Sequence, residues 1–322
     1  MGIMALLEIA LFVVALAILY ESSRHVLNAS IKLSQLLGIT EMAVGFILIA
    51  TATSVPDLMV SISAALMGKP EISVGDALGS TIANICLVFG IAALLRNVTI
   101  KREQTLESAE LLLFITLAPL LFILTGGLTH REGVVLLFMF VIYVLFIMRG
   151  RFTIKANAPV FKSRKEFSTQ LTFFIAAFIV VFISSHFVVL YGVEIAKMAG
   201  VPDAVIGLTL IAFATTLPEL AVDFRAIRSG HLALAVGDIF GSCVINLTLV
   251  LGAAAVISPI MDGFLDVFIL PIVFLLALSS VIWYILMKHE AIKKEHGLVL
   301  VILYVLWIIF EATGIRGAAI VT

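Results

Sequence analysis

Apolar segments long enough to cross a lipid bilayer recur along the whole chain, and they constrain its fold more than any other feature. Of the 322 residues, 62% are hydrophobic and 13% are charged, with a mean hydropathy of +1.22. A soluble domain is about 45–50% apolar and about 25% charged, so water cannot be the main solvent of this chain. Segments of about 20 apolar residues span the hydrocarbon layer as helices. A membrane β-barrel needs alternating segments of about ten residues, which this sequence lacks. We therefore predict an all-α, polytopic membrane protein.

Polar and Gly/Pro-containing breaks divide the chain into ten predicted transmembrane spans. They cover residues 3–32, 41–67, 73–95, 107–125, 133–149, 168–198, 204–228, 233–257, 264–287 and 297–315. The first segment has no basic stretch before it and no clear small-residue cleavage site. We therefore interpret it as a span and not as a signal peptide.

Lysine and arginine residues gather on one side of this predicted arrangement. Of the 20 basic residues, 16 lie in or beside the connections that follow odd-numbered spans. Basic residues near span ends accumulate on the cytoplasmic side of a membrane. We therefore predict a cell-membrane protein with both termini outside and with a cytoplasmic connection, residues 151–166, between a first half (1–150) and a second half (167–322). The net charge of -1 gives no case for a nucleic-acid partner.

The two halves contain the same sequence pattern. Residues 45–90 align with residues 207–252 at a constant offset of 162 without a gap, and 20 of the 46 positions are identical. The aligned pairs include Gly45/Gly207, Thr53/Thr215, Pro56/Pro218, Gly75/Gly237, Asp76/Asp238, Gly79/Gly241, Ser80/Ser242, Asn84/Asn246 and Gly90/Gly252, and also Asp57/Glu219 and Ser54/Thr216. The second copy begins five spans after the first, and five is odd, so the second enters the membrane from the opposite side. Inverted repeats of this kind place substrate sites near the bilayer midplane in secondary transporters.

Each copy carries a proline followed by a carboxylate in the middle of an apolar span: Pro56-Asp57 and Pro218-Glu219. Proline removes a helical donor and crowds the carbonyl four residues earlier, so we expect both helices to be kinked or interrupted. The carbonyls expected to lose helical partners are those around Ala50, Thr53, Ala212 and Thr215. An acid at mid-membrane costs about 2.5–3.5 kcal/mol, and neither span has a Lys or Arg near enough to neutralise it. Protons or metal cations must therefore do so, and a protonated structural acid is the alternative.

Further oxygen-bearing side chains follow in the next span of each copy. Ser80 and Asn84, like Ser242 and Asn246, are i, i+4 neighbours on one helix face. Hydroxyl, amide and carboxylate oxygens are ligands that calcium prefers, and sodium uses subsets of them. The absence of a His or Cys cluster disfavours zinc and copper.

Two other kinds of residue in these spans have simpler interpretations. Asp76 and Asp238 follow glycines at the predicted helix starts, where we interpret them as N-caps, with an entry path for cations as the alternative. Cys86 and Cys243 lie inside spans, and we expect unpaired thiols there.

These motifs resemble the α-repeats of the cation/calcium exchanger superfamily, and within it the sodium/calcium exchangers of microbes. The hallmark of that family is Gly-Thr-Ser-x-Pro-Glu followed by Gly-Asn-x-x-Gly-Ser-x-x-x-Asn. The corresponding segments here are Ala52-Thr-Ser-Val-Pro-Asp57 with Gly75-Asp-Ala-Leu-Gly-Ser-Thr-Ile-Ala-Asn84, and Ala214-Thr-Thr-Leu-Pro-Glu219 with Gly237-Asp-Ile-Phe-Gly-Ser-Cys-Val-Ile-Asn246. The resemblance implies ten helices around a core of the four motif helices, calcium and sodium as cargo, no cofactor, and sliding of the first and sixth spans across the core.

The resemblance also implies a set of ion ligands. Calcium would be held by the carboxylates of Asp57 and Glu219 and by the backbone oxygens of Thr53 and Thr215. The amides of Asn84 and Asn246 would complete this centre. Flanking sodium sites would use the hydroxyls of Ser54, Thr216, Ser80 and Ser242 and the carbonyls of Ala50 and Ala212.

Departures from the family pattern leave alternatives open. Ala52 and Ala214 replace the usual glycines, Asp57 is one methylene shorter than glutamate, and Asn246 stands where several microbial members have an acid. The Gly-Asn-x-x-Glu pattern of the proton/calcium branch is lacking, which favours sodium coupling, and a proton/calcium or other divalent-cation exchanger is the runner-up. A cation channel is the alternative from a different functional class. The lack of a nucleophile–base pair or a catalytic metal cluster argues against an enzyme. The oligomeric state stays open, with a monomer among the options.

Overall fold

The computed structural model describes residues 2–68, 70–98, 102–124, 127–149, 164–198, 203–259, 264–289 and 291–312. Within these ranges the chain is almost entirely helical. The β-structure found there is one isolated bridge between Val98 and Ile292, which joins the connection after α6 to the connection before α14. Most of the predicted connection 151–166 lies outside the described residues, and α9 begins at Arg164.

The described helices form ten segments that correspond to the ten predicted spans. They are α1 (Gly2–Leu37); α2 (Glu41–Val44), η1 (Gly45–Ile49), α3 (Ala50–Thr53) and α4 (Val55–Leu66); α5 (Pro70–Ala83), η2 (Asn84–Val88) and α6 (Phe89–Leu95); α7 (Arg102–Leu124); α8 (His130–Arg149); α9 (Arg164–Met198); α10 (Asp203–Arg228); α11 (Leu232–Ile245), η3 (Asn246–Val250) and α12 (Leu251–Ile257); α13 (Phe264–His289); and α14 (Lys294–Ala312). Among the described residues, six segments are long and apolar enough to cross a membrane, or seven if the bent segment α2–α4 counts as one span. The other three segments are α7, α10 and α14.

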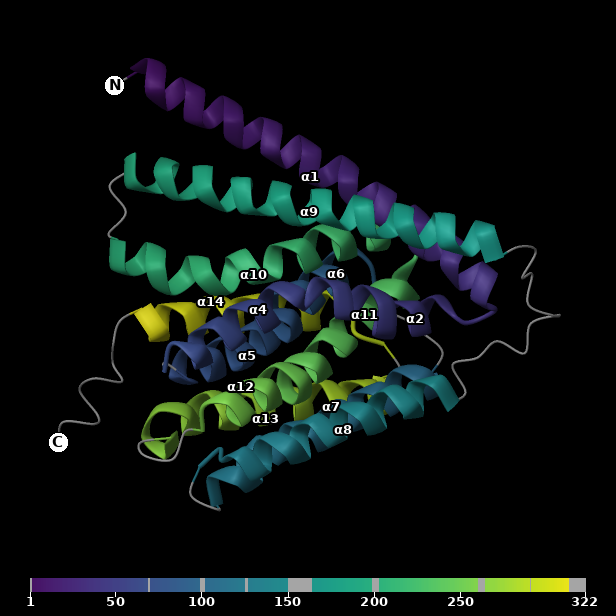
Figure 1. Cartoon of the computed structure of the whole chain (residues 1–322), viewed down its shortest axis with the longest axis vertical. Coiled ribbons are helices and arrows are strands. Elements are labelled where there is room, and N and C mark those ends of the chain that lie inside the picture. The colour runs from purple at the N-terminus through teal and green to yellow at the C-terminus, as the bar shows by residue number, and fades with distance from the viewer. Residues whose placement is uncertain are drawn as a thin grey trace.

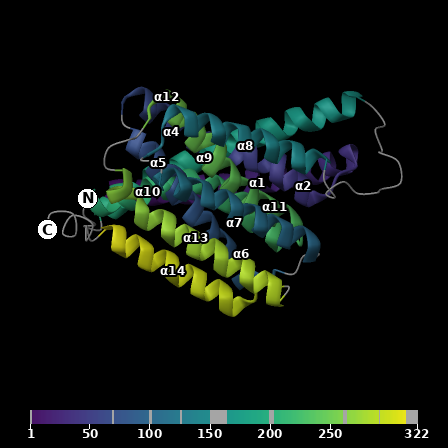
Figure 2. The ribbon, with the colours of Figure 1, turned by 90° about the horizontal axis from the view of Figure 1, so that it is seen from below.

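The helix contacts follow a pseudo-two-fold symmetry. The offset of 162 relates α1 to α9, α7 to α13, α6 to α12 and α8 to α14. The equivalent helices α1 and α9 pack along each other, and so do α7 and α13; α8 packs on α12 just as α14 packs on α6. Figure 1 shows the long pair α1 and α9 lying across one side of the remaining helices, and Figure 2 shows α7 beside α13 in the view from below. The two halves are therefore intertwined and do not form separate bodies.

Glycines that the offset relates make two of the turns and take part in two close helix crossings. Gly68 and Gly230, which the offset of 162 relates, have φ of +69° and +89° and end the α4 and α10 segments. At two outer crossings, a Cβ on Gly252 would lie 3.0 Å from the carbonyl oxygen of Gly133, and one on Gly297 would lie 2.6 Å from that of Gly90. Small residues let membrane helices approach until their backbones touch.

The tightest described core contact joins the first repeat to the second, between α2–η1 and α11. A Cβ on Gly45 would lie 2.8 Å from the backbone nitrogen of Asp238, and one on Gly241 would lie 2.8 Å from the carbonyl oxygen of Phe46. At the end of this contact, His231 Nδ1 lies 3.0 Å from the Glu41 carboxylate. This crossing holds the two motif helices at a fixed distance.

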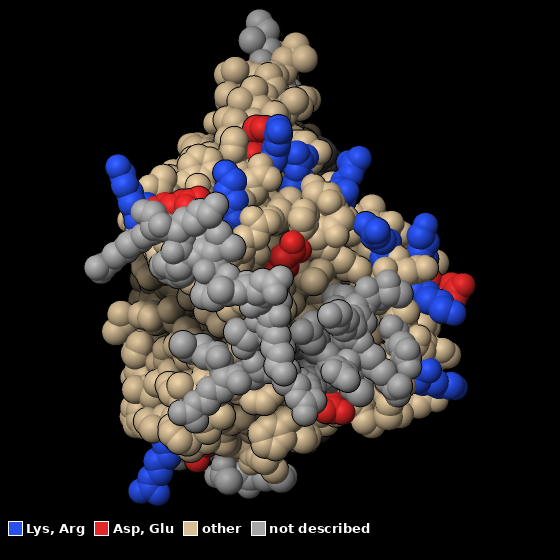
Figure 3. Space-filling model, turned by 90° about the vertical axis from the view of Figure 1, so that its right-hand side faces the viewer, with Lys and Arg blue, Asp and Glu red and all other residues tan. Residues whose placement is uncertain are grey.

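The start of α1 and the end of α14 lie at one end of the molecule, and the end of α8 and the start of α9 lie at the other (Figure 1). This placement agrees with an even number of crossings. Figure 3 shows the second end, where Lys and Arg side chains stand mainly around the rim, with Asp and Glu side chains beside some of them and nearer the middle. Basic residues thus occur at the end where the sequence places the basic side, and the assignment of this end to the cytoplasm stays a prediction.

Candidate cation-binding site

The first repeat is interrupted near its proline. α3 ends at Thr53 and α4 begins at Val55, and the two parts of the span meet at an angle of 42°. Pro56 has no N–H, so the carbonyl of Ala52 lacks its helical donor. The carbonyl of Ala50 keeps its partner, since it accepts the backbone N–H of Ser54 at 3.0 Å. The predicted break is confirmed, but the prediction that the Ala50 carbonyl loses its helical partner is wrong.

The second repeat differs at the equivalent place. α10 is one helix from Asp203 to Arg228 with Pro218 inside it. α10 is therefore not interrupted at Pro218, which leaves a kink as the remaining form of the prediction, and the proline leaves the carbonyl of Ala214 without its i+4 donor. Membrane helices tolerate such a proline because neighbouring groups compensate for the lost bond. The side chains of residues 203–214, which include Ala212, lie outside the described residues.

Asp57 and Glu219 are fully buried, with 0% and 1% of their surface exposed. One Asp57 oxygen, Oδ1, accepts the Ser80 hydroxyl at 3.2 Å, and the Thr215 hydroxyl and the Asn246 amide also lie against this carboxyl group. Among the described residues, Asp57 Oδ2 and both carboxyl oxygens of Glu219 have no hydrogen-bond donor. Arg225, on the same helix as Glu219, instead lies over the ring of Tyr20 at 4.5 Å.

Two pairs of hydroxyls join the repeats at the level of these carboxylates. Thr53 Oγ1 lies 3.2 Å from Ser242 Oγ, and Thr215 Oγ1 lies 3.3 Å from Ser80 Oγ. The offset of 162 converts one pair into the other. Nearby, the buried thiol of Cys243 contacts the carbonyl of its equivalent residue, Thr81, at 4.0 Å. The pseudo-two-fold axis therefore passes through this part of the core.

The other predicted ligands lie buried in the same segments. Ser54, Asn84, Thr216 and Asn246 are each at most 3% exposed. Within the part of the chain that the structure describes, the Ser54 hydroxyl and both polar atoms of the Asn84 amide make no hydrogen bond. Both cysteines are free and buried, as predicted.

The interpretation of Asp76 and Asp238 as N-caps is wrong. α5 begins at Pro70 and α11 begins at Leu232, so each aspartate lies six residues inside its helix. Asp76 Oδ2 accepts the Ser61 hydroxyl at 3.3 Å. Asp238 Oδ1 accepts hydroxyls from Thr53 at 3.2 Å and from Ser242 at 3.3 Å. Both carboxyl groups therefore belong to the polar interior of the bundle.

Asp223 is a buried acid that the sequence analysis missed. It is 0% exposed, lies four residues after Glu219 on α10, and contacts the carboxyl group of Asp238. The equivalent of Asp223 in the first repeat is Ser61, so a comparison of the two repeats that looks for shared acids does not identify Asp223. Its position as an acid within an apolar span is the signal that could have identified it.

The oxygens of this region come from several residue types. Within the described ranges, no group of three or more His, Cys, Asp or Glu side chains is placed to hold a metal. Carboxylates occur here among hydroxyl and amide oxygens, which are ligands that hard cations such as calcium accept.

Two inverted repeats of five helices that meet at buried carboxylates define a secondary transporter. A family model described as "Sodium/calcium exchanger protein" matches residues 7–149 and 169–312, one match in each half. The chain belongs to this family and is a multi-pass membrane protein that acts as a cation/calcium exchange antiporter.

Relatives of known name or structure agree with this assignment. CaxA of Alkalimonas amylolytica is 34% identical over 75% of this chain and 78% of its own length. The sodium/calcium exchanger MaX1 of Methanosarcina acetivorans is 25% identical over 93% and 97%. The solved structure of the sodium-calcium exchanger NCX_Mj superposes with a TM-score of 0.82 and 26% identity, covering 94% of this chain and 97% of that chain. The predicted ten-helix inverted-repeat fold is confirmed by this likeness.

Proposed function

We propose that this antiporter exchanges sodium for calcium across the cell membrane and that Asp57 and Glu219 carry the calcium ion between them. The observation that carries the proposal is the burial of these two carboxylates without a basic partner among the described residues. A buried charge that no counter-charge neutralises is strongly unfavourable. A transported cation that binds between Asp57 and Glu219 would neutralise both carboxylates while it is bound.

The neighbouring oxygens supply ligands for a calcium centre and for flanking sodium sites. The backbone oxygens of Thr53 and Thr215 and the amides of Asn84 and Asn246 complete the calcium centre. The sodium sites use the Ala50 and Ala212 carbonyls and the hydroxyls of Ser54, Thr216, Ser80 and Ser242. The helical bond to the Ala50 carbonyl does not exclude a cation there, because a carbonyl oxygen has two lone pairs. Calcium takes six to eight oxygens, so an incomplete set favours sodium.

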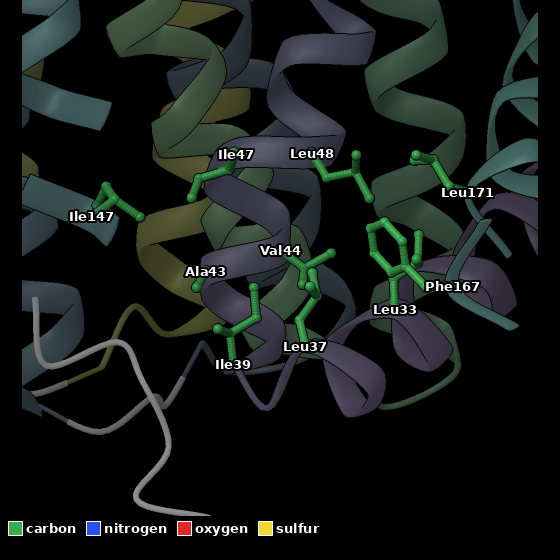
Figure 4. Close-up of a pocket in the computed structure, with 10 residues that line it drawn as sticks. All are labelled: Leu33, Leu37, Ile39, Ala43, Val44, Ile47, Leu48, Ile147, Phe167 and Leu171. Atoms are coloured by element: carbon green, nitrogen blue, oxygen red, sulfur yellow. The ribbon is translucent and has the colours of Figure 1, made fainter. Parts of the chain in front are cut away.

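Movement of α1 and α9 across the core gives each side of the membrane access in turn. These helices pack mainly on each other. An apolar pocket of about 340 Å³ separates part of α1 and α9 from α2 and η1. Figure 4 shows its lining, which includes Leu33, Leu37, Val44, Ile47, Leu48 and Phe167. An interface with such a gap forgoes packing contacts and is easier to slide than a filled one.

The names of the relatives favour sodium as the counter-ion. MaX1 is named a sodium/calcium exchanger, and NCX_Mj was solved after soaks with Na⁺ together with Ca²⁺ or Sr²⁺. Both proteins match more than nine-tenths of this chain.

The test is calcium-45 uptake by proteoliposomes that contain the purified protein. An outward sodium gradient should drive uptake at constant pH, and collapsing that gradient should stop it. If only a proton gradient drives uptake, the runner-up, proton/calcium exchange, replaces the proposal. Calcium movement that needs no counter-ion gradient would indicate a channel.

A further inference from the structure

A second pair of carboxyl groups lies beside the proposed calcium centre. Asp223 on α10 and Asp238 on α11 are both 0% exposed, and their carboxyl groups contact each other. Asp238 Oδ1 accepts two hydroxyls, whereas Asp238 Oδ2 and both carboxyl oxygens of Asp223 have no hydrogen-bond donor among the described residues. Asp223 is thus a fully buried acid whose polar neighbour, among the described residues, is the carboxyl group of another acid.

The first repeat has no such pair. The offset of 162 relates Asp238 to Asp76 and Asp223 to Ser61, and the Ser61 hydroxyl donates to Asp76 Oδ2 at 3.3 Å. The first repeat thus satisfies its aspartate with a neutral donor. The second repeat replaces that donor with another acceptor. The asymmetry adds one acid at the end of the core where α10 ends and α11 begins.

Two adjoining carboxylates away from water repel each other unless a positive charge lies between them. No Lys or Arg within the described residues forms an ion pair with either group. The cation at Asp57 and Glu219 does not neutralise them either, since those two carboxylates already balance one calcium ion. The hydroxyl oxygens of Thr53 and Ser242 lie against Asp238 and increase the number of oxygens available to a bound ion.

We propose that Asp223 and Asp238 form a second cation-binding site, separate from the central pair, for a hard oxygen-coordinated cation, Na⁺ or Ca²⁺. This assignment rests on the proposed cation-exchange function for the supply of these ions and for the calcium ion that the central pair balances. Thr53 and Ser242 connect the two sites, so an ion at Asp238 draws on hydroxyls that the central region also uses. The second site therefore influences how tightly the neighbouring sodium ions are held.

Equilibrium binding of calcium-45 and sodium-22 to the purified full-length protein tests this site directly. The informative variants are Asp223→Ser, which copies the first repeat, Glu219→Gln, which disables the centre, and the two combined. Wild type should bind one more ion per chain than Asp223→Ser in one of the two isotope arms, and that arm identifies the cation. Glu219→Gln should retain this ion, and the double variant should lose it.

Two results would overturn the second site. One is equal binding by wild type and Asp223→Ser in both arms, which would mean that a proton neutralises the pair. The other is the absence of any bound calcium-45 or sodium-22 in Glu219→Gln. This variant leaves Asp223 and Asp238 unchanged, so its result does not depend on how a substitution at those residues affects folding. Neither depends on transport, so failure of sodium-driven uptake in proteoliposomes with intact binding would count against the proposed function alone.

Discussion

The hydroxyl oxygens of Thr53 and Ser242 lie 3.2 Å apart although 189 residues separate them in the chain. Their equivalents, Thr215 and Ser80, meet at 3.3 Å. Each pair takes one residue from a proline-containing span of one repeat and one from the following span of the other. No single repeat can therefore build this site. The polar centre exists only when both inverted halves are folded together, and this dependence couples binding to the relative position of the halves.

Replacement of either central carboxylate should nearly abolish exchange. Asp57→Asn and Glu219→Gln keep the size of each side chain and remove the charge that replaces the hydration shell of calcium. We expect sodium-driven calcium-45 uptake to fall to the level of empty liposomes while the protein still elutes as a folded species. Glu110→Gln is the matched control, because that acid is exposed and accepts the Trp283 indole N–H at 3.5 Å, on α7 and not on a motif helix. Uptake near the wild-type rate in either central variant would refute the assignment.

The hydroxyls of Ser80 and Ser242 should affect sodium more than calcium. Sodium needs fewer oxygens, so losing one weakens its site while the carboxylates still hold calcium. Ser80→Ala and Ser242→Ala should raise the sodium concentration for half-maximal exchange several-fold, and a tenfold change would correspond to about 1.4 kcal/mol. Apparent calcium affinity should change much less. Equal shifts for both ions would mean that the hydroxyls serve one shared site.

The glycine crossing between α11 and the first repeat should be intolerant of added atoms. A Cβ on Gly237 would lie 3.1 Å from the backbone nitrogen of Phe46, and even closer to the carbonyl oxygen of Met42, so Gly237→Ala must push two backbones apart. Overpacking of this kind costs about 1–3 kcal/mol. Thermal unfolding in detergent should show the loss.

The repeat supplies the control for this substitution. Gly75 is the equivalent of Gly237, and a Cβ there meets no atom within 4 Å among the described residues. Gly75→Ala should therefore leave stability unchanged or raise it, because alanine is the better helix former by about 1 kcal/mol. Equal destabilisation by both substitutions would contradict the asymmetric packing.

The sequence predicts much of this fold because hydropathy and duplication are one-dimensional signals. Span positions follow from apolar length. The inverted relation follows because the spans that carry Asp57 and Glu219 are the second and the seventh, and an offset of five spans is odd. The pairing of Thr53 with Ser242 does not follow, since it depends on how far one repeat is inserted into the other. Asp223 was missed because its equivalent is a serine, and the symmetry that identifies shared ligands conceals those that only one repeat carries. The N-cap assignment of Asp76 failed because α5 begins at Pro70, which can occupy the first turn of a helix without losing a bond.

The orientation of the protein can be tested with single cysteines. A cysteine at position 163, in the α8–α9 connection outside the described residues, should be labelled from the cytoplasmic side only. A cysteine added before Met1 should be labelled from the outside only. Cys86 and Cys243 are buried, so the wild-type protein should give little background with a membrane-impermeant maleimide. Labelling of both positions from one side would contradict the odd number of spans between them.

Filling the pocket beneath α1 and α9 should slow exchange without weakening calcium binding. Leu48 lines this pocket of about 340 Å³ and precedes Asp57 by nine residues in the chain. Leu48→Trp therefore adds volume to the space into which α1 would slide. The tryptophan ring packs well when α1 and α9 are in the position that leaves the pocket open, but it must leave the pocket before the helices can close it. This requirement raises the energy barrier between the two positions of α1 and α9. We expect calcium-45 uptake to fall several-fold while equilibrium calcium binding stays within twofold of wild type. The control is Val13→Trp, because Val13 lies on α1, is 56% exposed and does not line the pocket. This variant should exchange calcium at the wild-type rate. If both tryptophan variants transport like wild type, then α1 and α9 do not close this gap during the cycle.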